Sequence, residues 1–478
     1  MGVLNRRGFL MLSAAGAAAA CSRHGGSPAT PTSSASPKAL EVALTPGATQ
    51  IDLGGVTVST WAYDGRVPGK EIRLRRGETL SAAVTNNLPA HTTVHWHGLA
   101  IPNPMDGVPI LTQPATAPGQ RFTYEFVVPD SGTYWFHSHQ GTQTDRGLYG
   151  PLIIEDPRER ANYDDELVLV LDDWIDGTGT DPDQVLANLK KNGMANMGPV
   201  GADAGVAPTT PLGDDGGDVT YPYYLINGRV TTNPQTVDYR AGQRIRLRII
   251  NAGGDTAFQV GVPNTKLTVT HTDGFPVVPR ETDSVILGMG ERVDATITVN
   301  SSVPVIADAY RKDGYAQLNM RVNGVASTVN AGEFVAALRN SAPLDTATLP
   351  AAPEVNLAPR NPDQTIELRL AGPTDGYNWT INGKLYNPPN DGIEVKAGQR
   401  VRFRFINESK MFHPMHFHGH TAQVMGPSGP AARKDTVLVA PLATVDMDFQ
   451  TVNPGRWINH CHNTYHLESG MATFLYYG

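Results

Sequence analysis

Cysteine is almost absent from this chain: its 478 residues contain only two, Cys21 and Cys461. A framework of several disulfide bonds is therefore excluded, and a chain of this length can bury a core large enough to do without one. No long apolar segment follows the N-terminal region, so we expect no transmembrane helix. The formal charge of -8 comes from interspersed acidic and basic residues, which argues against a nucleic-acid partner.

The N-terminus has the features of an export signal and not of a folded domain. Residues 5–10, Asn-Arg-Arg-Gly-Phe-Leu, resemble a twin-arginine motif, and the apolar run that follows is too short to cross a bilayer as a helix. We expect residues 1–20 to be a twin-arginine signal segment that exports the protein to the cell surface, the periplasm or the medium. A Gly/Ser/Pro-rich tether over 21–46 would follow. Cleavage after Ala20 would expose Cys21, and either a free or a lipidated Cys21 fits the sequence; lipidation is the only membrane attachment expected.

A pattern that occurs three times predicts a three-domain chain. Each copy has a turn at a glycine, then alternating polar and apolar residues, then an asparagine, over 74–86, 239–251 and 395–407. Alternation with a period of two is typical of a half-buried strand, and the copies are one β-sandwich domain apart. Few helices are expected, and the segments 184–191 and 333–339 are candidates for short ones. The fold prediction is all-β, with three consecutive Greek-key β-sandwiches.

Composition suggests the domain boundaries. A glycine-rich segment over 192–218 is expected to be a long surface loop, either a simple insertion or a flap in which Met194 and Met197 bind cuprous ion. A proline-rich stretch is expected to connect the second and third domains. The expected ranges are 47–157 for domain one, 158–340 for domain two, 341–362 for the linker and 363–478 for domain three.

The histidines are concentrated in four short motifs, each with a pair two residues apart. This spacing puts both imidazoles on one face of an extended strand, whereas helical metal sites use spacings of three or four. A single such pair is usually a surface or core pair without a metal, but four of them together favour metal binding. Ten of the 14 histidines lie in these motifs: His95 and His97; His137 and His139; His413, His416 and His418; His460, His462 and His466.

The last motif combines the ligand types of two different metal sites. Cys461, His466 and Met471 belong, with a further histidine, to the ligand set of a blue-copper site. His460 and His462 flank the cysteine and must face the opposite side of a strand, so they would bind other metal ions. Imidazole and thiolate suit copper. Ligand type alone does not exclude zinc, but a zinc site needs only four ligands.

In order, spacing and position, these four motifs resemble those of the multicopper oxidases, the family of laccases, cuprous oxidases and ascorbate oxidase. The resemblance extends from about Gly47 to the C-terminus. Within the family, the chain is most similar to laccase-like actinobacterial oxidases with a twin-arginine signal. It implies a cupredoxin fold for each domain and four copper ions, one of type 1, one of type 2 and two of type 3.

The resemblance also assigns the copper ligands. Because two motifs lie in domain one and two in domain three, the cluster of three coppers would sit between these domains, and domain two would act mainly as a spacer. An axial methionine implies a modest type 1 potential. The assignment is Cys461, His413, His466 and axial Met471 for type 1; His95 and His416 for type 2; His97, His137 and His462 for one type 3 copper; His139, His418 and His460 for the other.

The implied activity is one-electron oxidation of a substrate at the type 1 copper coupled to four-electron reduction of dioxygen to water. Phenols and aromatic amines, or cuprous ion in copper resistance, are the candidate substrates. Asp106 would pass protons, or would only form an Asp-Gly turn. Glu468 is a second candidate, although other family members have a carboxylate nearer the histidine. The alternative function is a copper-binding or electron-transfer protein without turnover, which would need no trinuclear histidines.

Overall fold

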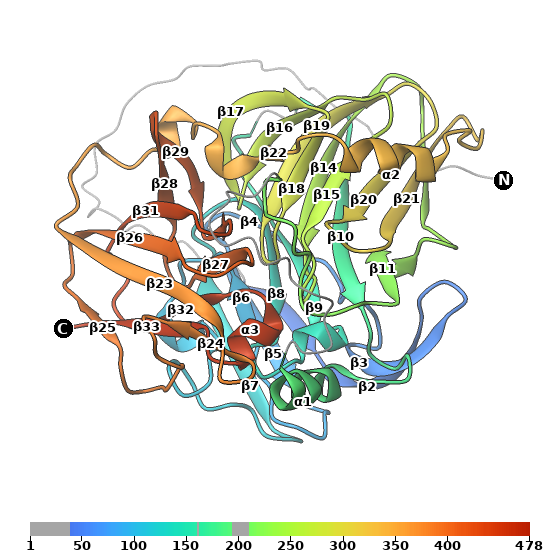
Figure 1. The fold of residues 1–478 in the computed structure, drawn as a ribbon. Helices are drawn as coiled ribbons and strands as arrows, with labels where there is room; N and C mark the ends of the chain where they lie inside the picture. Colours follow the sequence, from blue (N-terminus) through green and yellow to red (C-terminus); the bar gives the residue numbers. More distant parts are fainter. Residues whose placement is uncertain (1–38, 160–161, 194–209) are drawn as a thin grey trace, which may run out of the picture. The chain divides into compact units, whose positions relative to one another are not determined.

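The structure, a computed structural model, describes residues 39–159, 162–193 and 210–478. The expected export signal, most of the expected tether with Cys21, and Met194 and Met197 lie outside the described residues. Strands dominate the described chain, and its α-helices are the short α1 (Pro182–Asn192), α2 (Ala331–Arg339) and α3 (Thr464–Glu468) (Figure 1). The predictions of an all-β fold and of helices over 184–191 and 333–339 are confirmed.

The first part of the chain forms a hairpin and two sheets around an aromatic and aliphatic core. Strand β5 shows why it folds this way, because Leu80, Ala82 and Val84 are buried and alternate with half-buried residues. The hairpin is β2 (Pro46–Asp52) and β3 (Thr57–Tyr63); one sheet is β1 (Leu40–Leu44), β5 (Thr79–Thr85) and β7 (Arg121–Val127); the other is β4 (Ile72–Arg75), β9 (Tyr149–Glu155), β8 (Gly132–His137) and β6 (His95–His97), with short 3-10 turns at Asn103–Met105 and Thr144–Arg146.

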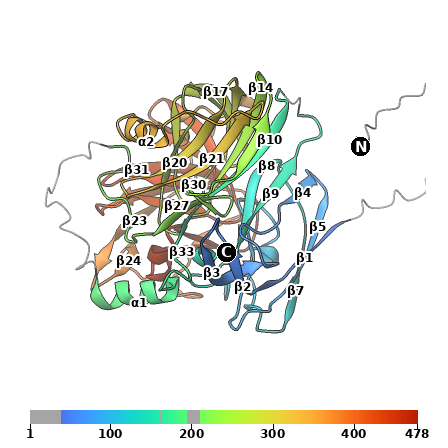
Figure 2. The same cartoon turned by 90° about the vertical axis from the view of Figure 1, so that its right-hand side faces the viewer.

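The middle of the chain forms two larger sheets, which are green to yellow in Figures 1 and 2. The first contains, in order, β12 (Arg229–Val230), β11 (Tyr223–Ile226), β10 (Asp165–Trp174), β14 (Gln243–Asn251), β19 (Arg292–Val299), β16 (Leu267–Thr272) and β17 (Phe275–Thr282). The second contains β13 (Thr236–Tyr239), β21 (Tyr315–Val322), β20 (Val303–Ala309), β15 (Phe258–Gly261), β18 (Ser284–Leu287) and β22 (Leu344–Asp345).

The last part of the chain again forms two sheets. The first contains β24 (Asn378–Ile381), β23 (Gln364–Thr374), β26 (Arg400–Asn407), β31 (Thr444–Gln450), β28 (Ala422–Gly426) and β29 (Gly429–Lys434). The second contains β25 (Ile393–Val395), β33 (Ala472–Tyr477), β32 (Arg456–Cys461), β27 (His413–Phe417) and β30 (Thr436–Val439).

The repeated sequence pattern forms the same strand–turn–strand unit in all three parts. The strand pairs are β4 and β5, β13 and β14, and β25 and β26. The turn glycines Gly77, Gly242 and Gly398 have φ angles of 84°, 84° and 80°. No atom outside the turn lies within 4 Å of a Cβ placed there, so the backbone conformation alone requires glycine.

One expected boundary needs correction. Strand β1 lies inside the range 21–46 that was assigned to the tether, and it pairs in parallel with β5 from Leu40 to Leu44. Leu44 is buried, so this segment is part of the first sandwich. The error has a simple cause: a five-residue strand whose partner is remote in sequence is hard to distinguish from a polar linker. The other proposed boundaries stay predictions.

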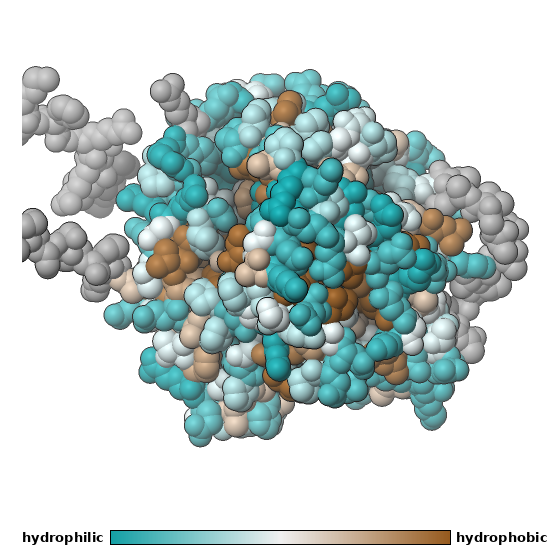
Figure 3. Space-filling model, turned by 90° about the vertical axis from the view of Figure 1, so that its left-hand side faces the viewer, coloured by the Kyte–Doolittle hydropathy of each residue, from teal (hydrophilic) through white to brown (hydrophobic). Residues whose placement is uncertain are grey.

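The surface mixes residue types, as the interspersed charges suggest. On the face drawn in Figure 3, hydrophilic residues predominate and hydrophobic ones occur in smaller groups between them. Within the described ranges, no helix is long and apolar enough to cross a membrane.

A buried ionic cluster joins the first part of the chain to the middle part. Asp294 is 1% exposed, and its carboxylate lies 2.6 Å from Arg246 and 3.3 Å from Arg248. It also accepts a hydrogen bond of 2.7 Å from the hydroxyl of Thr133 in β8. Burial opposes ionisation, but the two guanidinium groups prevail and lower the pKa of Asp294 to about 2. Since this value is below the unfolded one, the cluster stabilises the fold above about pH 4, and the stabilisation is lost as pH falls towards 2.

We expect Asp294→Asn to lower the free energy of unfolding by about 3 kcal/mol, because it leaves two buried guanidinium groups with less compensating charge. The thermal midpoint of the variant should also fall less between pH 7 and pH 3 than that of the wild-type protein. Thermal midpoints at pH 7 and pH 3 measure both effects. Asp238→Asn is the matched control, because the Asp238–Arg321 pair is exposed and should contribute little. Equal midpoints for the two variants would contradict the prediction.

Candidate metal centre

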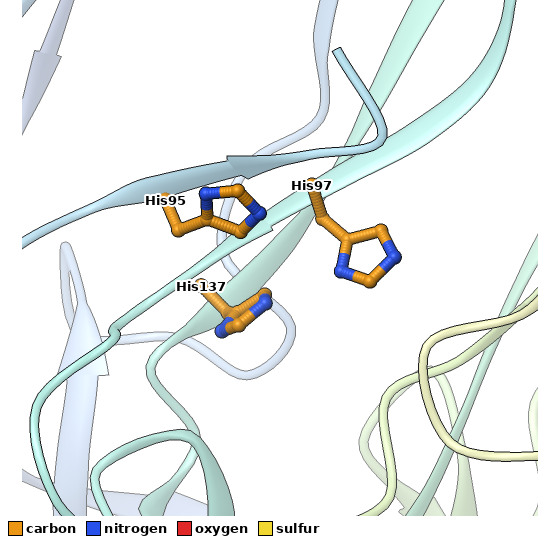
Figure 4. Close-up of side chains that lie close together, drawn as sticks. All are labelled: His95, His97 and His137. Carbon is orange, nitrogen blue, oxygen red and sulfur yellow. The ribbon is translucent and has the colours of Figure 1, made fainter. Parts of the chain in front are cut away.

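Four strands bring the histidine motifs together. In the first domain β6 and β8 are antiparallel, with His95 opposite His137. In the third domain β27 and β32 are antiparallel, with His416 opposite His460. The two pairs lie side by side in Figure 1, and the side chains of His95, His97 and His137 gather in one space in Figure 4.

Imidazole nitrogens from the two ends of the chain face one another at this junction. The Nε2 atoms of His95 and His416 are 3.4 Å apart. The Nε2 atom of His460 lies 3.4 Å from that of His139 and 3.1 Å from that of His418. Such distances between nitrogen atoms that point at a common space are those of ligands around a metal ion. The structure thus brings together the residues assigned to type 2 and to one type 3 copper.

The third group of histidines has buried nitrogens without partners. The rings of His97 and His137 lie 5.0 Å and 5.2 Å from the ring of His462. His97 Nδ1, His137 Nε2 and both nitrogens of His462 are buried and have no hydrogen-bond partner among the described residues. Each buried polar atom left unpaired costs about 1–3 kcal/mol, which a bound metal ion would offset. Burial also lowers the pKa of all three imidazoles well below the ordinary value, so they are neutral and can ligate. These residues fit a copper ion.

A second, separate site surrounds the cysteine. Cys461 Sγ lies 3.7 Å from His413 Nδ1 and 3.5 Å from His466 Nδ1, and the two nitrogens are 3.2 Å apart. All three side chains are buried. Met471 is buried too, and its backbone bonds to Cys461 and His466 hold it beside them. The set of one thiol, two imidazoles and a thioether fits a blue copper.

The outer nitrogens of the two type 1 imidazoles are held by groups outside the histidine motifs. His413 Nε2 lies 2.7 Å from the Ser409 hydroxyl, and His466 Nε2 donates to Asp218 over 2.9 Å. Burial opposes protonation of His466, but its bonds to Asp218 and Cys461 raise the pKa to about 10. A metal ion bound at this site would compete with that proton.

The alternation of side chains along β32 separates the two sites. His460 reaches His139 and His418 on one side, whereas Cys461 reaches His413 and His466 on the other. The strand thus presents the two groups of side chains on opposite faces, which is the geometry that two separate metal sites would need.

The two candidate proton carriers differ in position. Asp106 is fully buried, and its carboxylate lies 3.0 Å from His418 Nδ1 and 3.3 Å from His95 Nδ1. Glu468 is half-buried, and burial raises its pKa, but no hydrogen bond joins its carboxylate to a predicted ligand within the described chain. The structure therefore places Asp106 against the ligands and leaves Glu468 apart from them.

Residues that the motifs did not reveal complete the surroundings. Asp435, between β29 and β30, accepts a 3.1 Å hydrogen bond from His97 Nε2 through its carboxylate and a 2.9 Å bond from His416 Nδ1 through its carbonyl. From the middle domain, a Cβ on Gly290 would lie 3.0 Å from His97 and 2.9 Å from His462, so only glycine fits there. The middle domain, expected to act mainly as a spacer, therefore also borders the histidine rings. No local sequence signal marks these positions, because their roles depend on contacts between domains.

We expect copper loading to raise the thermal midpoint of the metal-free protein. A ligand at 1,000 times its dissociation constant stabilises the folded state by about 4 kcal/mol. His462→Gln should lose part of this gain, whereas His91→Gln, at an exposed histidine outside the ligand set, should keep it. Scanning calorimetry with and without copper measures the difference. A gain of equal size in both variants would argue against a ligand role for His462.

Comparisons with known proteins agree with this geometry. Family models described as multicopper oxidase match residues 47–159, 165–311 and 359–477. Multicopper oxidase MmcO of Mycobacterium tuberculosis is 43% identical over 92% of this chain and 87% of its own length. A copper resistance protein A homolog of Pseudomonas syringae pv. tomato is 28% identical over 90% of this chain and 91% of its own.

A solved structure shows the same fold. Fet3p, a multicopper oxidase that functions in iron import, superposes with a TM-score of 0.76 over 92% of this chain and 90% of its own, at 21% identity. The three matched segments correspond to the three successive β-sandwich regions, which have the cupredoxin fold. The chain belongs to the multicopper oxidase family, whose members bind four copper ions.

Proposed function

We propose that this copper-dependent oxidase binds its metal ions with the residues described above and takes its electrons from cuprous ion. Bound copper supplies one-electron transfer at the type 1 site and the reduction of dioxygen to water at the trinuclear site. The observation that carries the residue assignment is the set of buried imidazole nitrogens that face one another and have no other hydrogen-bond partner in the described part of the chain. The proposed set is His95, His97, His137, His139, His413, His416, His418, His460, Cys461, His462, His466 and Met471.

The chain's own backbone offers a short covalent path between the two sites. Cys461 is bonded in sequence to His460 and His462, so an electron that enters at the sulfur reaches the cluster through a few covalent bonds. The same residues keep the two sites apart, because the strand turns their side chains to opposite faces. This division suits a reaction that collects electrons singly and needs four of them for each dioxygen. It also disfavours a simple electron carrier, which has no use for the second site.

The surroundings of His466 support a small cation as the substrate. His466 is fully buried, and the Trp379 ring packs 3.9 Å from its own ring. Its outer nitrogen bonds to Asp218, which also accepts the Tyr377 hydroxyl. Because neighbouring side chains cover His466 in this way, an aromatic substrate could not contact the edge of its imidazole ring. The second oxygen of Asp218 is buried and has no hydrogen-bond partner among the described residues, so it is available to a cation.

Carboxylates near Asp218 strengthen this argument. Burial raises the pKa of Asp215 to about 6, and Asp218 and Asp255 add to the rise because like charges oppose its ionisation. Asp255 is already paired with Lys312 at 2.6 Å. Asp215 and Asp218 remain as acidic groups beside the unpartnered oxygen, and acidic groups attract a cation more than a neutral phenol. The chain is also similar to a protein named for copper resistance, which is in keeping with copper as the substrate. Cuprous ion would be oxidised outside the cytoplasm, to which we propose that the N-terminal segment exports the protein.

We expect Asp218→Asn to lower kcat/KM for cuprous ion about 10-fold to 100-fold and to change the oxidation of a methoxyphenol much less. The reason is that the substitution removes the charge that faces the cation, while an amide can still accept from His466. Oxygen consumption with each donor gives the two values. Asp238→Asn is a control that removes an exposed carboxylate elsewhere.

Three results would contradict the proposal in different ways. A faster reaction with the phenol than with cuprous ion in the wild-type protein would make it a laccase. Equal losses for both donors in Asp218→Asn would mean that the carboxylate only orients His466. A blue protein that consumes no dioxygen with either donor would be a carrier.

Asp106 is proposed to hold and pass protons at the trinuclear site. Its carboxylate touches two proposed ligands, and its Oδ1 atom is buried with no hydrogen-bond partner within the described chain, so it can bind a water molecule. We expect Asp106→Asn to lower kcat about 10-fold to 100-fold with the blue absorption unchanged. Glu468→Gln is the matched control, and we expect it to keep most of the activity. The reverse order of the two losses would assign the proton role to Glu468.

A further inference from the structure

Arg292 is a fully buried charged side chain near the proposed cluster, yet it comes from the middle domain, which has no histidine motif. It begins β19, and its side chain is 0% exposed, as is that of Asp435 in the third domain. The two form a bidentate pair, with Nη1 2.8 Å from Oδ1 and Nη2 2.6 Å from Oδ2. Two parallel charge-assisted hydrogen bonds fix the plane of a carboxylate as well as its position.

Two further N–H groups of Arg292 are also used. Nε donates to the carbonyl of Thr133 in the first domain over 3.2 Å, and Nη1 donates to the carbonyl of Gly290 over 2.9 Å. The guanidinium thus contacts all three domains at one point. Because its partners lie on every side, it cannot move without breaking several buried hydrogen bonds.

Asp435 passes this constraint on to two proposed ligands. Its Oδ1, the oxygen that faces Nη1 of Arg292, also accepts from His97 Nε2 over 3.1 Å and lies 3.4 Å from His416 Nδ1. The backbone carbonyl of Asp435 accepts from His416 Nδ1 as well. One carboxylate therefore orients one imidazole of the type 2 pair and one of a type 3 group.

His97 shows why this orientation matters. The other first-domain ligand at the end of its strand, His137, bonds through Nδ1 to a carbonyl and leaves Nε2 free. His97 is reversed, because Nε2 bonds to Asp435 and Nδ1 is the buried nitrogen without a partner among the described residues. Asp435 thus selects the tautomer with the proton on Nε2, which leaves the Nδ1 lone pair for the metal.

We propose that Arg292 is a positioning residue for the trinuclear site: through Asp435 it fixes the tautomer of His97 and the orientation of His416, so that domain two sets the copper affinity of a cluster to which it contributes no ligand. The inference rests on the ligand assignment of the proposed function.

Copper binding to the metal-free protein tests the proposal. The Arg292→Lys variant keeps the positive charge but loses the planar guanidinium that makes two parallel hydrogen bonds. We expect it to bind the trinuclear coppers about 10-fold to 100-fold more weakly. The type 2 electron paramagnetic resonance signal should change, while the blue absorption and affinity of the type 1 site stay as in the wild type. Arg292→Met should show at least the same loss. Copper per molecule at buffered copper concentrations, together with the two spectra, gives each quantity.

Arg246→Lys is the matched control, since Arg246 is also a buried domain-two arginine paired with a carboxylate, but it touches no proposed ligand. The proposal is overturned if Arg292→Lys binds four coppers with wild-type affinity and an unchanged type 2 signal. It is also overturned if type 1 and trinuclear copper are lost in parallel, or if Arg246→Lys has the same effect. A wild-type protein that binds fewer than four coppers would instead refute the ligand assignment itself, so the two failures are distinguishable.

Discussion

A buried imidazole is oriented for ligation when its other nitrogen is hydrogen-bonded, and this constraint acts on most of the histidines at the centre of the molecule. His95, His137 and His460 direct Nδ1 to backbone carbonyls 2.8 Å away, which leaves Nε2 for a metal ion. The carbonyls come from the same short segments as the ligands or from a turn beside them. Orientation of these rings is therefore built into local backbone structure and needs no further domain.

The ligands whose outer nitrogens are held by side chains depend on tertiary structure instead. His97 relies on Asp435, His418 on Asp106 and His466 on Asp218. Each of these carboxylates is buried, so each carries a desolvation cost that only hydrogen bonds and nearby cations can offset. Hydrogen bonds and ion pairs between domains offset this cost. The packing of the three sandwiches therefore determines how well the carboxylates orient the histidine rings.

The sequence predicted the strands and the ligand clusters because both are local patterns. Two histidines two residues apart lie on the same face of any strand that contains them. A glycine followed by alternating polar and apolar residues is likewise typical of a turn followed by a half-buried strand. Asp435 and Arg292 could not be found in this way, since their partners are 338 and 143 positions away in the contacts that give them a role. The short strand β1 was assigned to the tether for the same reason: its partner β5 lies remote from it in the chain.

The position of the middle domain follows from these contacts. Two sandwiches with histidine motifs could meet face to face without a third, but the imidazoles would then lack a cation to balance the carboxylate that orients them. An arginine from outside the motifs supplies this balance without competing for the metal, because a guanidinium has no lone pair to donate. Gly290, two residues before Arg292, gives the rings of His97 and His462 the space they need. On the proposed assignment, the same turn of domain two supplies both the positive charge beside Asp435 and the space for the two rings, so a domain that contributes no ligand still shapes the metal centre.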